Sequence, residues 1–293
     1  SAASDVYKRQ GYSKRGVEGG EENRPTGRAN SMTIFPKTDM KNSDIIAFSF
    51  REEQARIASS PLYSHPTASL WQRCLSVGSL FCEAVVAAGF LTWEQMVCAA
   101  GRYCLGATRR QGVIFWQIDR EGRVHDGKVM YYGPDCHRLK DRLHHPTWVS
   151  TLLARRSALR SVSGQSSHCF FGLHLVDGLQ TVCVVESEKS AVILSVLYPD
   201  CVWLATGGLG ELQPDKFRPL RGCKVVLFPD TDSDGIAFRR WHTAADVVMQ
   251  QPFWEDSPPV RVSPLLECHA TQQQKAAKID LVDYWFEASK HHV

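Results

Sequence analysis

The segment TVCVVE, residues 181–186, is the feature that most limits the fold of this chain. A strand with one face in water alternates apolar and polar residues, whereas an unbroken apolar run is typical of a parallel strand covered on both faces. A helical pattern, SEKSAVILSVLY, comes next, followed by CVWLAT, a glycine turn and KVVLFPD. Strand, helix, strand, loop and strand is the order of doubly wound α/β sheets. We therefore expect residues 177–288 to form a Rossmann-like parallel sheet.

Acidic residues and glycines follow the three expected strands. The first strand is followed by Glu186, the second by Thr206, Gly207 and Gly208, and the third by DTDSDG at residues 230–235. The reactive groups of such sheets gather where the strands end. The two glycines can hold a phosphate on backbone N–H groups or simply make a tight connection, because the P-loop lysine is lacking. The carboxylates need a cation or solvent, since an isolated buried charge is very costly.

The spacing of these carboxylates suits a divalent cation. Asp230 and Asp232 offer the oxygen ligands that Mg²⁺ prefers, and Glu186 can complete the site or move a proton. Asp234 suits a turn or a helix cap equally well, and Asp/Ser/Gly strings also make ordinary turns. A calcium loop is excluded because the glutamate that it requires at its twelfth position would fall at Trp241 or His242. The set is suited to phosphoryl transfer with one or two metal ions.

Helical patterns occupy residues 46–108. Apolar residues recur three and four positions apart from Ser69 onward, and Thr92 with Gln95 forms a capping box. We expect two helices here, joined between Gly89 and Thr92.

Residues 1–45 are expected to contribute nothing to the fold. The first ten resemble the in-frame translation of a sequencing adapter and are interpreted as a non-native scar. Residues 11–31 have almost no apolar side chains, which predicts a disordered leader. The authentic chain then begins later, with Met32 as one candidate start, and an N-terminal module can be missing.

Residues 109–176 carry strand patterns. VIFWQID and GKVMYY flank a turn at Glu121 and Gly122, which predicts a hairpin, and HCFFGLHLV predicts a further strand.

Charge is distributed unevenly along the chain. Residues 102–160 contain 12 basic and 5 acidic side chains, whereas residues 176–293 contain 11 basic and 16 acidic ones. The net charge of +3 is therefore a cancellation between a basic and an acidic part.

The basic side chains can neutralise a phosphate backbone beside the acidic strand ends. They are Arg109, Arg110, Lys128, Arg138, Lys140 and Arg142. Trp116, Tyr131 and Tyr132 are available for stacking on bases, although Phe115 and Trp116 are expected to pack in the core. The alternative is that these arginines and lysines are simply solvated.

The ten cysteines include no C-x-x-C pair, which excludes a zinc ribbon and favours small buried side chains in a reducing compartment. The longest nearly apolar stretch, Ala84 to Leu91, is far shorter than the ~20 residues of a membrane span, and no signal peptide is visible. We expect a cytoplasmic protein with no membrane partner.

The C-terminal segment SPLLECHATQQQKAAKIDLVDYWFE predicts one amphipathic helix.

The order VVESEKSA, LATGG and VVLFPDTDSDG resembles the toprim domain of primases, topoisomerases and recombination nucleases. The resemblance implies an acid/base or metal role for Glu186, Mg²⁺ binding by Asp230 and Asp232, and Asp234 as the third acidic position. Lys189 lies in a version of the motif found in phage and plasmid primases.

The stretch from Tyr103 to Tyr284 also resembles an uncharacterised toprim-like family of mobile elements, domain of unknown function 6371. The shared segments are FWQID, GKVM, FGLHLV, VESEKSA, LATGG and FPD. Members often carry a cysteine-rich zinc finger ahead of this core, which this sequence lacks. The expected fold is thus α/β: a toprim parallel sheet at residues 177–288, preceded by a small β-rich basic subdomain at 109–176 and a helical N-terminal segment.

These resemblances imply a primase-like enzyme of a mobile or phage-derived element that uses Mg²⁺ or Mn²⁺. Single-stranded DNA, nucleotides and a replicative helicase are the expected partners. The residues expected to contact nucleic acid or nucleotide are Lys128, Arg138, Lys140, Lys189, Gly207 and Gly208. A toprim nuclease that cleaves phosphodiesters and a non-catalytic module that binds DNA or a helicase are the alternatives.

Overall fold

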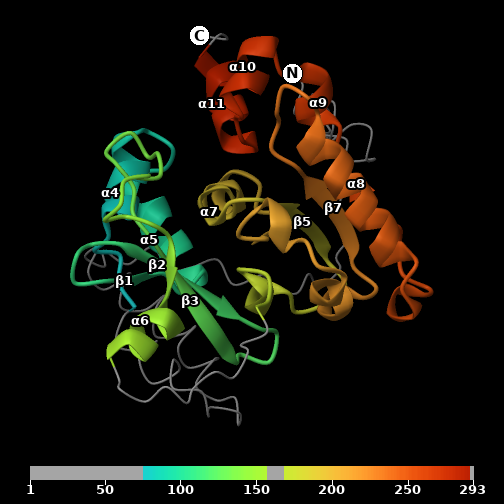
Figure 1. The fold of residues 1–293 in the computed structure, drawn as a ribbon, viewed down its shortest axis with the longest axis horizontal. Helices are drawn as coiled ribbons and strands as arrows, with labels where there is room; N and C mark the ends of the chain where they lie inside the picture. Colours follow the sequence, from blue (N-terminus) through green and yellow to red (C-terminus); the bar gives the residue numbers. More distant parts are fainter. Residues whose placement is uncertain (1–74, 157–167, 291–293) are drawn as a thin grey trace, which may run out of the picture. The chain divides into compact units, whose positions relative to one another are not determined.

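Two four-stranded sheets frame the part of the chain that the computed structural model describes, residues 75–156 and 168–290 (Figure 1). The first sheet is antiparallel, and its strands in order are β1 (Gly106–Ala107), β2 (Val113–Ile118), β3 (Val124–Met130) and β4 (Thr147–Trp148). The second sheet is parallel, and its strands in chain order are β5 (Thr181–Val185), β6 (Val202–Ala205), β7 (Lys224–Phe228) and β8 (Arg261–Val262). The expected α/β fold with a parallel sheet is confirmed at this level.

Within the described residues, two helices precede the first sheet, as predicted. They are α4 (Leu80–Ala87) and α5 (Trp93–Arg102). Thr92 accepts a hydrogen bond from the backbone N–H of Gln95, and the Gln95 side chain accepts one from the backbone N–H of Thr92. This reciprocal capping box satisfies two N–H groups that a helix start would otherwise leave unpaired.

The hairpin of β2 and β3 forms the centre of the antiparallel sheet. Its turn contains Gly122 at φ +79°, and the Asp119 carboxylate accepts the backbone N–H groups of Glu121 and Arg123. Every residue of β2 is buried, including Phe115 and Trp116, which confirms the prediction that these two rings belong to the core. α6 (Val149–Arg156) follows β4 and packs against β3.

The segment HCFFGLHLV does not form the strand that its apolar residues predict. Phe171 makes a single antiparallel bridge to Ala205, and the chain then turns into the 3₁₀ helix η1 (Leu173–Leu175). Gly172 lies at φ +83°, a conformation that glycine reaches without strain and that cannot continue a strand. The strand prediction is therefore wrong because the glycine redirects the backbone.

The parallel sheet has the order β6-β5-β7-β8. α7 (Glu188–Leu197) connects β5 to β6, and the chain then crosses to the other side of β5 through η2 (Leu209–Glu211) and η3 (Pro214–Leu220) to reach β7. This reversal of direction makes the carboxyl ends of β5 and β7 a topological switch point, which is where ligands of open α/β sheets bind.

α8 (Ile236–Met249) follows β7 and runs beside the edge of the sheet that ends in β8 (Figure 1). Its Trp241 is fully buried, together with all residues of β5 after Thr181. Burial of the whole β5 interior agrees with the unbroken apolar run in its sequence. η4 (Pro252–Trp254) then leads to β8.

The C-terminal segment forms three helices rather than the single one predicted. They are α9 (Leu265–His269), α10 (Gln272–Ala277) and α11 (Leu281–Lys290). Thr271 starts a new helix by capping the backbone N–H of Gln274, and Lys278 ends it in the left-handed conformation at φ +55°. The single-helix prediction is wrong because these local signals interrupt the helical period.

All described residues belong to one unit of packing, residues 42–293. The other unit, residues 1–41, and with it the adapter scar and leader expected at residues 1–45, lies outside the described residues. None of the helices in the described ranges is long and apolar enough to cross a membrane. The cysteines of these ranges form no disulfide bonds, and most of them are buried.

Candidate functional site

Two of the predicted acidic residues meet at the carboxyl edge of the parallel sheet. β5 and β7 are adjacent, with Val185 opposite Phe228 as their last pair. Glu186 follows Val185 directly, and Asp230 lies two residues beyond Phe228. Glu186 and Asp230 are both partly buried. The structure thus places them on neighbouring strand ends at the switch point.

The Asp230 carboxyl group lies among other carboxylates. Burial and the negative charges of Asp280 and Glu186, with Asp283 adding to them, raise the pKa of Asp230 well above its usual range, while Lys189 opposes the shift. The start of α11 is held beside the end of β7, because the backbone N–H of Thr231 donates to the carbonyl of Ile279 at 3.3 Å. Asp230 therefore lies where a cation is favoured.

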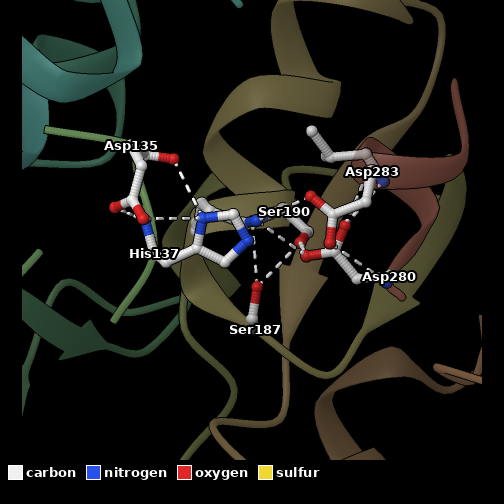
Figure 2. A network of polar contacts seen from close by, with 8 residues as sticks. Asp135, His137, Ser187, Ser190, Asp280 and Asp283 are labelled. Atoms are coloured by element: carbon white, nitrogen blue, oxygen red, sulfur yellow. Dashed lines mark hydrogen bonds and ion pairs between the residues drawn. The ribbon is translucent and has the colours of Figure 1, made fainter. Parts of the chain in front are cut away.

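Lys189 supplies positive charge to this cluster. Its ammonium lies 3.1 Å from the Asp280 carboxylate and 3.3 Å from that of Asp283. Asp280 also accepts the Ser190 hydroxyl at 2.8 Å and the backbone N–H groups of Val282 and Asp283 (Figure 2). Burial favours the neutral form of Asp280, but Lys189 and these donors lower its pKa. Lys189, which the sequence assigned to nucleic acid, is buried within ion pairs.

Asp232 caps a helix. Its Oδ1 accepts the backbone N–H groups of Asp234 at 3.0 Å and Ile236 at 2.9 Å, and its Oδ2 accepts that of Ala237 at 2.7 Å. Although burial opposes it, these three donors lower the pKa of Asp232. Asp234 is exposed. Asp232 therefore binds the first turn of α8 from the preceding loop, and the structure does not bring the exposed Asp234 side chain to the carboxylate cluster.

Lys128 crosses from the antiparallel sheet to the parallel one. Its Nζ lies 3.0 Å from Glu188 Oε1 and donates to the carbonyl of Gly207 at 2.6 Å. The side chains of Lys128 and Glu188 are 12% and 3% exposed, so this is a buried ion pair. Gly207 and Gly208 lie at φ +84° and +151°, which explains the two glycines at this tight connection.

The loop after β3 lies close to the acidic cluster. Burial raises the pKa of the Cys136 thiol to about 12, and the charges of Lys189 and Asp280 also act on it. Arg138 and Lys140, in the same loop, are exposed. His137 beside them contacts the carbonyl of Asp135 at 3.0 Å (Figure 2). The other predicted phosphate contacts that are exposed to solvent are Arg109, Arg110 and Arg142.

The predicted aromatic contacts are mostly unavailable for stacking on bases. Trp116 is 0% and Tyr132 4% exposed. Tyr131 is partly buried and packs against His144 at a ring distance of 4.8 Å. Tyr131 is therefore the only one of these three side chains that is not classed as buried.

The donor set fits a divalent cation in part. Glu186 and Asp230 provide hard oxygen ligands at adjacent strand ends, and their mutual repulsion is the kind that a cation relieves. Within the described ranges, however, no three His, Cys, Asp or Glu side chains are grouped closely enough to hold a metal ion. A metal bound there would take its remaining ligands from water or from substrate oxygens, as Mg²⁺ commonly does.

Sequence reasoning missed Asp280 and Asp283. Both flank the start of α11, where Asp280 accepts backbone N–H groups of the first helical turn. The signal that can reveal this is the order Ile-Asp-Leu-Val-Asp, an aspartate placed directly before an apolar helical run. It indicates a cap but does not reveal that the cap lies beside Lys189.

Residues 85–231 match a protein family described as Domain of unknown function (DUF6371), and this match spans half of the chain. The chain belongs to the DUF6371 family. The DUF6371 match begins within α4 and ends at Thr231, so it includes Glu186 and Asp230 and stops before Asp232. No curated protein matches the chain.

Among solved structures, the chain is similar to the crystal structure of the primase fragment of Bacteriophage T7 primase-helicase protein. The identity is 17% and the TM-score 0.35, over 56% of this chain and 60% of that fragment. The DUF6371 chain thus covers less than two thirds of the fragment's length.

Proposed function

We propose that this chain is a primase-like protein that acts on nucleic acid with a divalent cation, Mg²⁺ or Mn²⁺, held by Glu186 and Asp230. The observation that carries the proposal is the position of these two carboxylates on adjacent strand ends at the switch point, with the pKa of Asp230 raised by its acidic neighbours. Such a site combines low solvent exposure with excess negative charge, which a divalent cation and phosphate oxygens compensate together.

In this proposal the cation, when bound, neutralises the phosphate oxygens of a nucleotide or strand. Glu186 and Asp230 hold it, and Asp232 fixes the loop after β7 by capping α8. The exposed Arg138 and Lys140 contact the phosphates of single-stranded DNA. The remaining predicted contacts with nucleic acid or nucleotide stay predictions; they involve Lys128, Lys189, Gly207 and Gly208. To make such contacts, both lysines would first have to leave buried ion pairs.

A primer-synthesis assay on single-stranded DNA with nucleotides and Mg²⁺ tests the proposal. We expect product from the natural chain and a loss of about 100-fold or more from Asp230→Asn, which keeps the shape of the side chain and removes its charge. Asp234→Asn is the matched control, since its exposed carboxylate belongs to the same loop. An Asp230→Asn protein as active as the control would contradict the proposal.

The same proteins, incubated with labelled DNA and Mg²⁺ but without nucleotides, test the nuclease alternative. A primase leaves the label intact, whereas a toprim nuclease shortens it. Degradation that is lost in Asp230→Asn would replace primer synthesis by strand cleavage at the same site.

A second candidate function is a non-catalytic module that binds DNA or a partner helicase. It is favoured by the lack of a three-ligand metal group in the described ranges and by the use of Asp232 as a helix cap. Calorimetric titration with Mg²⁺ separates the two. The primase-like proposal requires binding that Asp230→Asn abolishes, whereas DNA binding without any Mg²⁺ binding supports the module.

A further inference from the structure

A pocket of about 580 Å³ opens at the edge of the parallel sheet opposite the acidic site. Its walls come from the β2–β3 turn, from the segment before β5 and from the segment before β7. The charged side chains that line it are Arg120, Arg123, Arg218, Arg221, Glu121 and Asp177. Four arginines against two carboxylates give these walls a formal charge of +2. We propose that this pocket binds phosphate groups, from a free nucleotide or from a nucleic-acid backbone.

Arg120 is fixed in the wall of the pocket by neutral partners. Its Nε donates to the carbonyl of Val176 at 3.0 Å, and its Nη1 donates to that of Pro219 at 2.7 Å. Both acceptors belong to residues that line the pocket. No carboxylate takes part in these two bonds, so they hold the guanidinium in the pocket wall without offsetting its charge.

Two further arginines can bind a phosphate group in the pocket. Arg221 is exposed, and among the described residues its side chain has no ion pair or hydrogen bond. Arg218 pairs with Asp215 at 2.9 Å, but the two side chains are 59% and 81% exposed, so the pair is weak. The Arg218 guanidinium also lies 4.3 Å from the centre of the Phe253 ring, which orients it.

Arg123 contributes less, because Asp119 and Glu121 neutralise it at 2.6 and 3.0 Å. The available cations are therefore Arg120, Arg218 and Arg221, from two sides of the pocket. Guanidinium groups match the tetrahedral oxygens of phosphate in a fork geometry, which lysine cannot reproduce.

The volume and lining of the pocket define the class of ligand. Small-molecule sites usually measure roughly 300–1,000 Å³, and the pocket falls within this range. Among the residues that the structure describes, none of those lining the pocket is aromatic, so they provide no stacking surface for a base. The pocket is also separate from Asp230, since the five residues of β5 span about 16 Å between the two edges. Phosphate bound here is thus distinct from phosphate at the acidic site.

The test compares the natural chain with an Arg218→Ala/Arg221→Ala double variant. Arg240→Ala, which removes one exposed arginine of α8 away from the pocket lining, is the control for a change of surface charge outside the pocket. Binding of ATP is measured by calorimetry, and binding of a labelled 15-nucleotide oligo-dT by fluorescence anisotropy between 50 and 200 mM salt. We expect the double variant to weaken binding of at least one probe about tenfold. If the oligonucleotide occupies the pocket, its salt slope falls by about 1.4.

The two probes identify the source of the phosphate. Loss of ATP binding alone indicates a nucleotide, and loss of oligonucleotide binding alone indicates a strand. If both probes bind the double variant as tightly as Arg240→Ala, the proposal is overturned. It is also overturned if only Asp230→Asn weakens them, since the phosphate then binds at the acidic edge. If a probe still binds Asp230→Asn but binds the double variant more weakly, the pocket is supported even if the proposed function is wrong.

Discussion

Replacing Asp232 with alanine removes the cap of α8, and the structure sets the size of the effect. The three backbone N–H groups that Asp232 accepts, at 3.0, 2.9 and 2.7 Å, return to water or stay unpaired. The N-cap residue of α8 is Gly235, but Asp232 accepts the same kind of free N–H groups, and loss of such a side-chain acceptor costs about 1 kcal/mol; the interaction of a carboxylate with the helix dipole adds about 0.5 kcal/mol. We expect Asp232→Ala to lower the free energy of unfolding by about 1.5 kcal/mol. For a unit of this size the thermal midpoint then falls by about 3–6 °C.

Urea and thermal unfolding, followed by circular dichroism, measure this loss. Asp234→Ala is the control, because its carboxylate is exposed and the backbone N–H that Asp232 binds stays in place. The pKa of Asp232 is lowered in the folded chain, so its contribution is present above the unfolded pKa and fades as the pH falls through the folded one. A difference of less than about 0.3 kcal/mol between the two variants refutes the capping argument. So does a difference that appears only with Mg²⁺, which would make Asp232 a metal ligand.

Three further predictions concern charge. Lys128→Met leaves Glu188 buried without its cation, so urea unfolding should show a loss of about 3 kcal/mol that a second change, Glu188→Gln, largely restores. The pKa of Asp230 is raised, so its ionised form is unfavourable at neutral pH. Asp230→Asn should raise the thermal midpoint measured at pH 7, with a smaller gain in acid, where the natural side chain is already neutral. Although burial opposes it, His125 and Arg123 lower the pKa of Asp119 to about 2. Stability should therefore fall by about 1–2 kcal/mol between pH 4 and 2, a loss that Asp119→Asn lacks when followed by acid unfolding.

The parallel sheet is predictable because its determinants are local. The apolar run at residues 181–185 indicates a strand covered on both faces without information on any distant residue. The helical pattern that follows it in the sequence forms α7 in the structure. Placing Glu186 and Asp230 together needs only the rule that parallel strands end at one edge. The parallel sheet and the placement of these two residues at one of its edges therefore follow from sequence, whereas the strand order β6-β5-β7-β8 was not predicted.

The partners of the charged residues are not predictable in this way. Lys189 and Asp283 are separated by 94 positions, and Lys128 and Glu188 by 60. No local pattern distinguishes a lysine that will pair with a buried carboxylate from one that will remain in solvent. Sequence reasoning therefore assigned both lysines to phosphate, whereas the fold places them in ion pairs.

Apolar composition also predicts the wrong secondary structure where the backbone conformation of one residue ends a strand or a helix. HCFFGLHLV has the residues of a strand, but Gly172 at φ +83° turns the chain. In the C-terminal segment the capping box at Thr271 is visible in the sequence, and it outweighs the continuing helical period. A single residue with a special conformation or a cap can thus end an element whose side chains would continue it.

The reach of Lys128 between the two sheets has a consequence for how the chain unfolds. Besides this ion pair, the Tyr103 hydroxyl donates to the carbonyl of Trp203 at 2.7 Å, and Arg120 bonds two carbonyls of the parallel half. Separating the halves would break all of these bonds at once, and most of them are buried. The backbone amides of β2 and of β5 should therefore exchange with deuterium at similar free energies of opening, as parts of one cooperative unit.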